Sequence, residues 1–101
     1  PEQVKILPVS ERYNNYAAEV SKKLKIYDIR ALVDERNEKV GRKIRDAEVE
    51  KMPYMLIVGE EEEKNSSVSV RKQGDGDKGS MTIETFAELI KNEIDSELKR
   101  N

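Results

Sequence analysis

The sequence predicts an α/β fold, a three-layer sandwich in which helices cover both faces of a mixed β-sheet. Three observations support this prediction. Segments rich in β-branched residues alternate with segments of helical spacing in the order βαβαββα. Residues 54–58 are an uninterrupted apolar run, which is typical of a strand in the middle of a parallel sheet. Residues 66–71 alternate instead, and they follow a short acidic segment that favours an antiparallel return.

The first third of the chain predicts a strand, a helix and a second strand. Residues 4–9 are rich in β-formers and include Pro8, which lacks the NH that a ladder needs, so we expect a first strand here. Ser10 suits the N-cap of a helix of roughly four turns. The apolar stripe of that helix is Tyr13, Tyr16, Ala17, Val20, Leu24 and Tyr27. A short second strand follows at residues 31–33.

The second helix is expected to begin in the charged segment 34–46. Its predicted buried stripe is Val40, Ile44 and Ala47. Lys51 falls on the same line at the end of the helix, so its amine must reach solvent or a partner. Gly41 costs about 1 kcal/mol relative to alanine inside a helix, which suggests that another backbone passes close by. Pro53 then ends the helix, because the residue before a proline disfavours helical geometry.

The last third predicts a strand pair and a final helix. Glu60 to Glu63 are interpreted as an open, solvated acidic turn, after which Val68 and Val70 face inward from one strand. Residues 73–79 are rich in glycine and aspartate and predict a flexible loop, and residues 80–81 could add a short edge strand. Thr82 is expected to cap the last helix. Its inward stripe is Ile83, Phe86, Ala87, Ile90, Ile94 and Leu98.

Length and composition restrict the function. The 101 residues suit one domain, and because the chain begins at Pro1 without a charged leader we interpret it as a segment of a longer protein. The longest apolar run is too short to span a bilayer. With no cysteine and no histidine, the chain lacks a thiol nucleophile, the usual zinc ligands and the commonest general base. Most hydrolytic chemistries are therefore excluded.

Charge is abundant but nearly balanced. The 19 basic and 21 acidic residues leave a net charge of −2, which gives no support to nonspecific binding of nucleic acid. The distribution is uneven, because five cations and one acid occupy residues 36–45 while residues 60–63 are all glutamate. Such runs are also common on ordinary solvated surfaces.

Enzymatic motifs do not occur. No glycine-rich phosphate loop follows the strand at residues 54–58, and no Gly-x-Gly-x-x-Gly opens a helix. The loop at residues 74–77 has two carboxylates but lacks the third ligand and the closing glutamate of a calcium loop. We therefore expect no catalytic centre, no cofactor and no metal ion in this chain.

Five motifs in order resemble the C-terminal anticodon-binding domain of threonyl-tRNA synthetase, a class II enzyme. They are the strand Val-Lys-Ile-Leu-Pro-Val at the start, then Arg-Asn-Glu-Lys-x-Gly-x-Lys-Ile-Arg, Pro-Tyr-Met-Leu-x-Val-Gly, Val-Ser-Val-Arg and Gly-Ser-Met. The resemblance covers nearly the whole chain, residues 1–101, as a single domain. It implies a five-stranded mixed sheet flanked by helices, and binding to the anticodon loop of threonine tRNA.

The resemblance also assigns residues. Asn37, at the expected start of the second helix, matches an anticodon-base contact, and Arg71 matches a base-contacting arginine. Glu62 matches a glutamate that recognises a base edge, within a run of four glutamates that blurs the alignment. Lys51 falls where some members carry an arginine, so the charge is kept and the planar fork is lost. Residues expected to contact the tRNA backbone are Lys39, Lys43 and Arg45, with Arg42 a weaker candidate.

These side chains suit the bases that a threonine anticodon presents, guanine and then uracil at its second and third positions. Guanine offers a donor pair that suits a carboxylate and a carbonyl that suits arginine, and uracil offers an NH between two carbonyls that an amide can meet. Each residue also has an ordinary structural interpretation. Asn37 could start a helix, Lys51 could end one, Arg71 could be an edge-strand charge, and Glu62 could serve solubility.

The resemblance further implies a longer, cytoplasmic parent enzyme. That enzyme would be a homodimer using ATP and magnesium, with zinc in its catalytic domain, whereas the present chain alone would be a non-catalytic monomer. One alternative is the equivalent domain of a prolyl-, histidyl- or glycyl-tRNA synthetase. Another is an α/β module that docks a small ligand or a protein and shares only the architecture.

Overall fold

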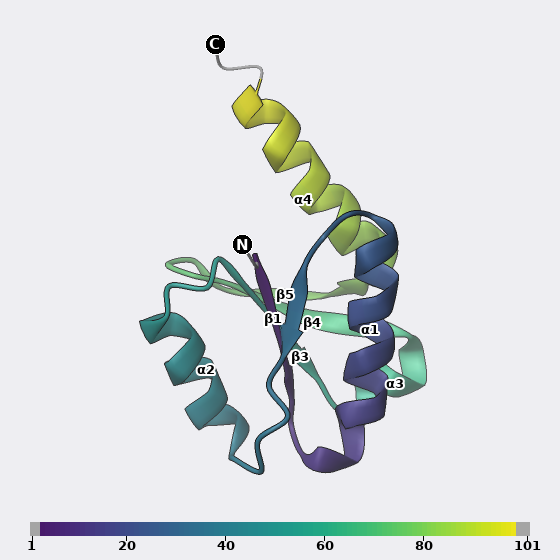
Figure 1. The fold of residues 1–101 in the computed structure, drawn as a ribbon, viewed down its shortest axis with the longest axis vertical. Helices are drawn as coiled ribbons and strands as arrows, with labels where there is room; N and C mark the ends of the chain where they lie inside the picture. Colours follow the sequence, from purple (N-terminus) through teal and green to yellow (C-terminus); the bar gives the residue numbers. More distant parts are fainter. Residues whose placement is uncertain (1–2, 99–101) are drawn as a thin grey trace.

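The computed structural model describes residues 3–98, with side chains up to Glu93 in the last helix. Five strands form one mixed sheet in the order β2-β1-β3-β4-β5 (Figure 1). The strands are β1 (Val4–Pro8), β2 (Ala31–Val33), β3 (Tyr54–Val58), β4 (Ser67–Lys72) and β5 (Gly76–Thr82). The helices are α1 (Asn14–Ile26), preceded by a 3-10 turn η1 (Glu11–Tyr13), α2 (Val40–Val49), α3 (Glu60–Asn65) and α4 (Ile83–Leu98). The predicted α/β sandwich with a five-stranded mixed sheet is confirmed.

The directions of the strands determine which loops lie at the same edge of the sheet. β1 runs parallel to both of its neighbours, β2 and β3. β4 then runs antiparallel to β3, with Arg71 opposite Met55, and β5 runs antiparallel to β4. Because β1, β2 and β3 are parallel, the loops after their carboxyl ends meet at one edge of the sheet.

The core has two parts, one on each face of the sheet, and Figure 1 shows α1 and α2 on opposite sides of it. On one face, α1 and α4 cover β1, β3 and β4 with fully or nearly fully buried side chains that include Ala17, Val20, Leu24, Phe86, Ala87 and Ile90. On the other face, Ala47 of α2 packs with Leu7 and Met55. Apolar side chains thus alternate across β3, Met55 toward α2 and Leu56 toward α1.

The ends of the predicted helical stripes differ from the prediction. Tyr16 is buried and its hydroxyl donates to the carbonyl of Ser67 at 2.6 Å, but Tyr13 is half-buried and Tyr27 is 40% exposed because α1 ends at Ile26. Thr82 caps α4 as predicted, since its hydroxyl accepts from the NH of Thr85 at 3.1 Å. The side chains of Ile94 and Leu98 lie outside those that the structure describes.

Two segments that we predicted to be irregular are regular. The glutamate run forms α3 rather than an open turn, because the NH of Gly59 donates to Oε1 of Glu62 at 2.8 Å and the acidic first turn complements the helix dipole. The predicted flexible loop is short, and residues 76–82 pair with β4 as a full edge strand. Within residues 3–98, no helix combines the length and apolar character that crossing a membrane requires.

Candidate nucleic-acid interface

The four predicted recognition residues lie at two ends of the central strand β3. Asn37 follows β2 and Glu62 follows β3, so both lie beyond the carboxyl edge of the parallel strands. Arg71 pairs with Met55 near the start of β3, and Lys51 immediately follows α2 on the way into that strand. Gly59, which directly follows β3, lies four residue steps beyond Met55, which corresponds to roughly 13 Å at about 3.3 Å per residue. The structure therefore forms two pairs of candidates rather than one cluster.

Asn37 lies in a loop, and the prediction that it starts a helix is wrong. α2 begins at Val40, after an extended Lys39 that makes no side-chain cap. Asn37 is exposed at the tip of a tight turn, which the NH of Glu38 closes by donating to the carbonyl of Arg36 at 2.9 Å. Its amide group is therefore presented to solvent from a short, hydrogen-bonded loop.

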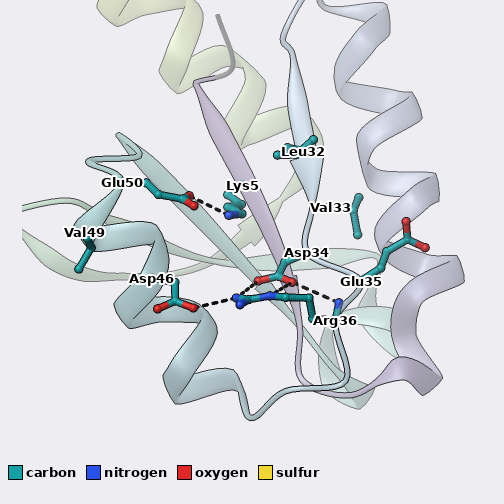
Figure 2. Close-up of a pocket in the computed structure, with 9 residues that line it drawn as sticks. All are labelled: Lys5, Leu32, Val33, Asp34, Glu35, Arg36, Asp46, Val49 and Glu50. Carbon is teal, nitrogen blue, oxygen red and sulfur yellow. Dashed lines mark hydrogen bonds and ion pairs between the residues drawn. The ribbon is translucent and has the colours of Figure 1, made fainter.

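A charged cluster fixes the base of this loop (Figure 2). Both carboxylate oxygens of buried Asp34 accept from the guanidinium of Arg36, at 2.9 Å from Nε and 2.8 Å from Nη2. Nη2 of Arg36 is also 3.0 Å from Oδ2 of Asp46 on α2. The hydrogen bonds from Arg36 lower the pKa of Asp34 against the opposing effect of burial, and the two carboxylates raise the pKa of Arg36.

Lys43 is a structural residue, and the prediction that it contacts the tRNA backbone is wrong. Its side chain is 0% exposed, and its amine donates to the carbonyls of Pro8 at 2.9 Å and Asp34 at 3.2 Å. These carbonyls end β1 and follow β2, so the lysine joins α2 to the carboxyl edge of the sheet. A phosphate cannot reach an amine in this position.

Other cations around α2 remain available. Lys39, Arg45 and Lys51 are exposed, and Lys51 adopts a left-handed backbone conformation with φ of 61° directly after the helix. Arg42 is also exposed, with its Nε 3.7 Å from Oδ2 of Asp46. Gly41 does not mark a close approach as predicted, because a Cβ built there meets nothing within 4 Å.

Glu62 stabilises the start of helix α3. One of its carboxylate oxygens accepts from the NH of Gly59 and so caps α3. Gly59 itself is buried, and a Cβ there would come within 3.0 Å of a methyl group of Val9. The helix cap therefore fixes Glu62 at the carboxyl edge, whether or not its second oxygen also meets a base.

Arg71 carries an unsatisfied donor. Its Nε is buried and has no hydrogen-bond partner among the residues that the structure describes, although the side chain as a whole is half-buried. The ladder between β4 and β5 shifts register between Val70 and Arg71, and such irregularities re-aim side chains. Buried donors are normally paired, so this Nε is an exception on β4, and an outside acceptor could meet it only after the side chain moved to expose it.

Arg71 lies on the more open side of the sheet. Its neighbours Val68 and Val70 are fully buried against the α1 and α4 side, whereas Ser69 and Arg71 are half-buried on the other side. α2 packs against β1 and β3 on that side, and β4 and β5 lie further along the sheet. On that side the structure places Arg71 and the exposed cations around α2, which are groups that recognise base edges and phosphates, while the exposed amide of Asn37 lies at the other end of β3.

Sequence analysis missed the cluster of Asp34, Arg36 and Asp46. Its signal was weak, because an aspartate that directly follows a short strand is also an ordinary turn residue. Lys43 could have been found from its spacing, since it lies one helical turn before buried Ala47. Among the residues whose side chains the structure describes, no group of three or more histidine, cysteine or acidic residues could hold a metal ion.

Comparison with known proteins identifies the family of this chain. The family model described as "Anticodon binding domain" matches residues 3–93. Threonine–tRNA ligases of Parabacteroides distasonis and Porphyromonas gingivalis are 59% and 64% identical over 100 and 95 residues. These alignments cover 99% and 94% of this chain but only 15% and 14% of those enzymes.

Solved structures share the fold. The RNA-binding domain of threonyl-tRNA synthetase from Cryptosporidium parvum superimposes with a TM-score of 0.84 at 23% identity, covering 91% of this chain and 23% of that one. Histidyl-tRNA synthetase from Nostoc also gives 0.84, at 18% identity, covering 93% and 23%. Because both scores are equal, the fold alone does not distinguish these synthetases.

The fold and the family match together define the class: this chain belongs to the anticodon-binding domain family of class II aminoacyl-tRNA synthetases. Sequence identity then separates the members that the fold does not. With 59% identity over nearly its whole length, the chain is the counterpart of the anticodon-binding domain of threonyl-tRNA synthetase.

Proposed function

We propose that this domain binds the anticodon loop of threonine tRNA and recognises its second and third bases. It thereby positions the tRNA for aminoacylation by a catalytic domain elsewhere in a longer threonine–tRNA ligase. The chain spans only 15% of the length of its Parabacteroides relative, which supports a role as one part of such an enzyme. The parent enzyme would be a cytoplasmic homodimer that uses ATP and magnesium and holds zinc in its catalytic domain.

The observation that carries this proposal is the unsatisfied Nε of Arg71. A buried donor without an acceptor costs about 1 to 3 kcal/mol, so a side-chain movement that exposes this Nε to an acceptor on a bound partner would be favourable. Guanine offers its O6 and N7 in a geometry that matches the arginine fork. We therefore assign Arg71 to the guanine at the second anticodon position.

Asn37, at the other end of β3, provides the second base contact in this proposal. Uracil presents one NH between two carbonyls, and an amide can both accept from and donate to this edge. Because Asn37 is exposed at the centre of a hydrogen-bonded turn, its amide faces solvent from a fixed backbone position. We assign it to the uracil, while Lys39, Arg45 and Lys51 contact phosphates.

Glu62 and Lys51 make weaker contributions in this proposal. The α3 cap occupies one oxygen of Glu62, which leaves one oxygen for a base edge. Lys51 provides charge but no planar fork, so it places the loop rather than distinguishing its bases. The domain alone is proposed to be a monomer.

Equilibrium binding of labelled anticodon stem-loops tests this function. The probes are the threonine stem-loop, two variants with the second or third anticodon base changed, and a stem-loop with an unrelated anticodon of equal length. We expect the threonine stem-loop to bind more tightly than each single variant by about fivefold or more, equivalent to at least about 1 kcal/mol. Equal binding of all four probes would refute anticodon recognition, and preference for a proline, histidine or glycine anticodon would favour the related synthetases.

A further inference from the structure

The backbone around Asn37 is held on both sides. The NH of Arg36 donates to Oδ1 of Asp34 at 3.2 Å, and the carbonyl of Arg36 accepts from the NH of Glu38 at 2.9 Å. This second bond closes a three-residue turn with Asn37 at its centre. The position of the Asn37 amide therefore depends on the position of Arg36.

Arg36 in turn is clamped between two carboxylates. Figure 2 shows its guanidinium between Asp34 and Asp46. Asp34 accepts from Nε and Nη2 in a two-point contact, and Asp46 lies 3.0 Å from Nη2. A planar fork that meets a carboxylate at two points has little rotational freedom. The clamp thus connects the loop after β2 to helix α2.

The base of the loop is attached to the sheet. The NH of Asp34 donates to the carbonyl of Ile6 at 2.9 Å, and its own carbonyl accepts from the amine of buried Lys43. Asp34 is itself buried, so solvent does not compete freely for its carboxylate. Asp34 is therefore fixed by hydrogen bonds through its backbone NH, its carbonyl and its carboxylate.

We propose that Asp34, Arg36 and Asp46 are positioning residues for anticodon discrimination, acting through the placement of Asn37 and not as contacts to RNA. This inference rests on the proposed function, because it needs Asn37 to meet a base. The alternative, that Arg36 binds phosphate, suits the site poorly, since its Nε and Nη2 already face two carboxylates that would repel a phosphate. A donor held in place beforehand discriminates bases better than one that can follow a different edge.

Asp46→Ala separates positioning from simple electrostatics. If charge alone mattered, removing an acid beside the RNA would strengthen binding to all stem-loops alike. If Asp46 positions Arg36, the variant should instead lose discrimination at the base that Asn37 meets. Glu48→Ala is the matched control, because Glu48 is an exposed acid on the same helix whose carboxylate makes no contact with the loop among the described residues.

The readout is the ratio of dissociation constants for the altered and the threonine stem-loop. We expect Asp46→Ala to lower this ratio about fivefold, Glu48→Ala to leave it unchanged, and Asp46→Asn, which keeps an acceptor oxygen, to restore part of it. In an Asn37→Ala background, Asp46→Ala should cause no further loss, because both changes remove the same contact. Urea unfolding of each variant shows that the domain remains folded.

Several results would overturn the inference. The first is a ratio of dissociation constants for Asp46→Ala that equals the ratio for Glu48→Ala. The second is a double variant in which Asp46→Ala lowers this ratio further than Asn37→Ala alone. The third is an Asn37→Ala variant whose ratio equals that of the wild type. The first two results leave the proposed function intact if the wild-type domain still prefers the threonine stem-loop, whereas no effect of Asn37→Ala would also remove the assignment of Asn37 to the uracil. A wild-type domain without that preference would refute the proposed function and the inference with it, so the two failures can be told apart.

Discussion

Lys43 is a fully buried cation whose replacement distinguishes a structural role from an RNA contact. Its amine meets only the carbonyls of Pro8 and Asp34 within the described part of the chain, at 2.9 and 3.2 Å. Lys43→Met keeps most of the aliphatic side chain and removes both donors. Lys43→Ala also removes the volume that fills the space between α2 and the sheet. The two variants therefore separate hydrogen bonding from packing.

The expected losses of stability follow from these contacts. Hydrogen bonds from a charged donor contribute about 1.5 to 3 kcal/mol each, but removing the amine also relieves the cost of burying it. We therefore expect Lys43→Met to lower the free energy of unfolding by about 1 to 3 kcal/mol. Lys43→Ala loses in addition the methylene groups beyond Cβ at about 0.8 kcal/mol each, and it leaves a cavity, so its total loss should be about 4 kcal/mol. The whole free energy of unfolding of a domain of this size is about 5 to 15 kcal/mol.

Urea unfolding measures these losses from the shift of the midpoint at constant slope. Arg45→Ala, an exposed change on the same helix, serves as control and should shift stability by less than about 0.5 kcal/mol. The salt dependence of stem-loop binding by folded Lys43→Met should equal that of the wild type. Losses below about 0.5 kcal/mol in both variants, with a shallower salt slope, would refute the structural role and restore a phosphate contact.

Three further predictions follow from other parts of the structure. Because Arg36 lowers the pKa of Asp34, the ionised carboxylate stabilises the fold at pH values above its ordinary pKa of about 3.9. This contribution is lost as the pH falls through the pKa that Asp34 has in the folded state. Urea midpoints measured from about pH 5 to pH 2 should therefore fall less in Asp34→Asn than in the wild type. Gly59→Ala should destabilise the domain by about 1 kcal/mol, because the added Cβ would come within 3.0 Å of Val9. Gly41→Ala should stabilise it by about 0.5 to 1 kcal/mol, because a Cβ there meets nothing and alanine favours a helix. Shifts of the urea midpoint that have the same sign in both variants would contradict this. With Lys43 buried, the phosphate contacts proposed are Lys39, Arg45 and Lys51, so a log-log salt plot should have a slope of roughly −2 to −3, and a slope near zero would remove these contacts.

The fold was predictable where apolar spacing was strong. Residues 54–58 have no alternation, and they form the strand β3 with Met55 buried against α2 and Leu56 against α1. The stripe from Ile83 to Ile90 likewise predicted the buried face of α4. β5 was predicted too short, because an edge strand exposed to solvent needs no apolar pattern and pairs through its backbone alone.

The candidate site was less predictable because it depends on contacts between distant residues. Lys43 looked like a surface cation, and only the carbonyls of Pro8 and Asp34 make its burial favourable. The start of α2 was misplaced because its N-cap, Lys39, uses no side-chain cap of the kind that sequence patterns reveal. The unsatisfied Nε of Arg71 is likewise a property of packing rather than of composition.

Recognition of anticodon bases by Asn37 and Arg71 is the central claim, and a matrix of variants against stem-loops tests it most directly. Asn37→Ala, Arg71→Ala and the control Arg45→Ala are each measured against the threonine stem-loop and against stem-loops altered at the second or third anticodon base. Asn37→Ala and Arg71→Ala should each cost about 1 to 3 kcal/mol with the threonine stem-loop and flatten the preference at one position, the third for Asn37 and the second for Arg71. Arg45→Ala should weaken all stem-loops alike. Unchanged discrimination in both Asn37→Ala and Arg71→Ala would contradict the assignment of these residues to the bases.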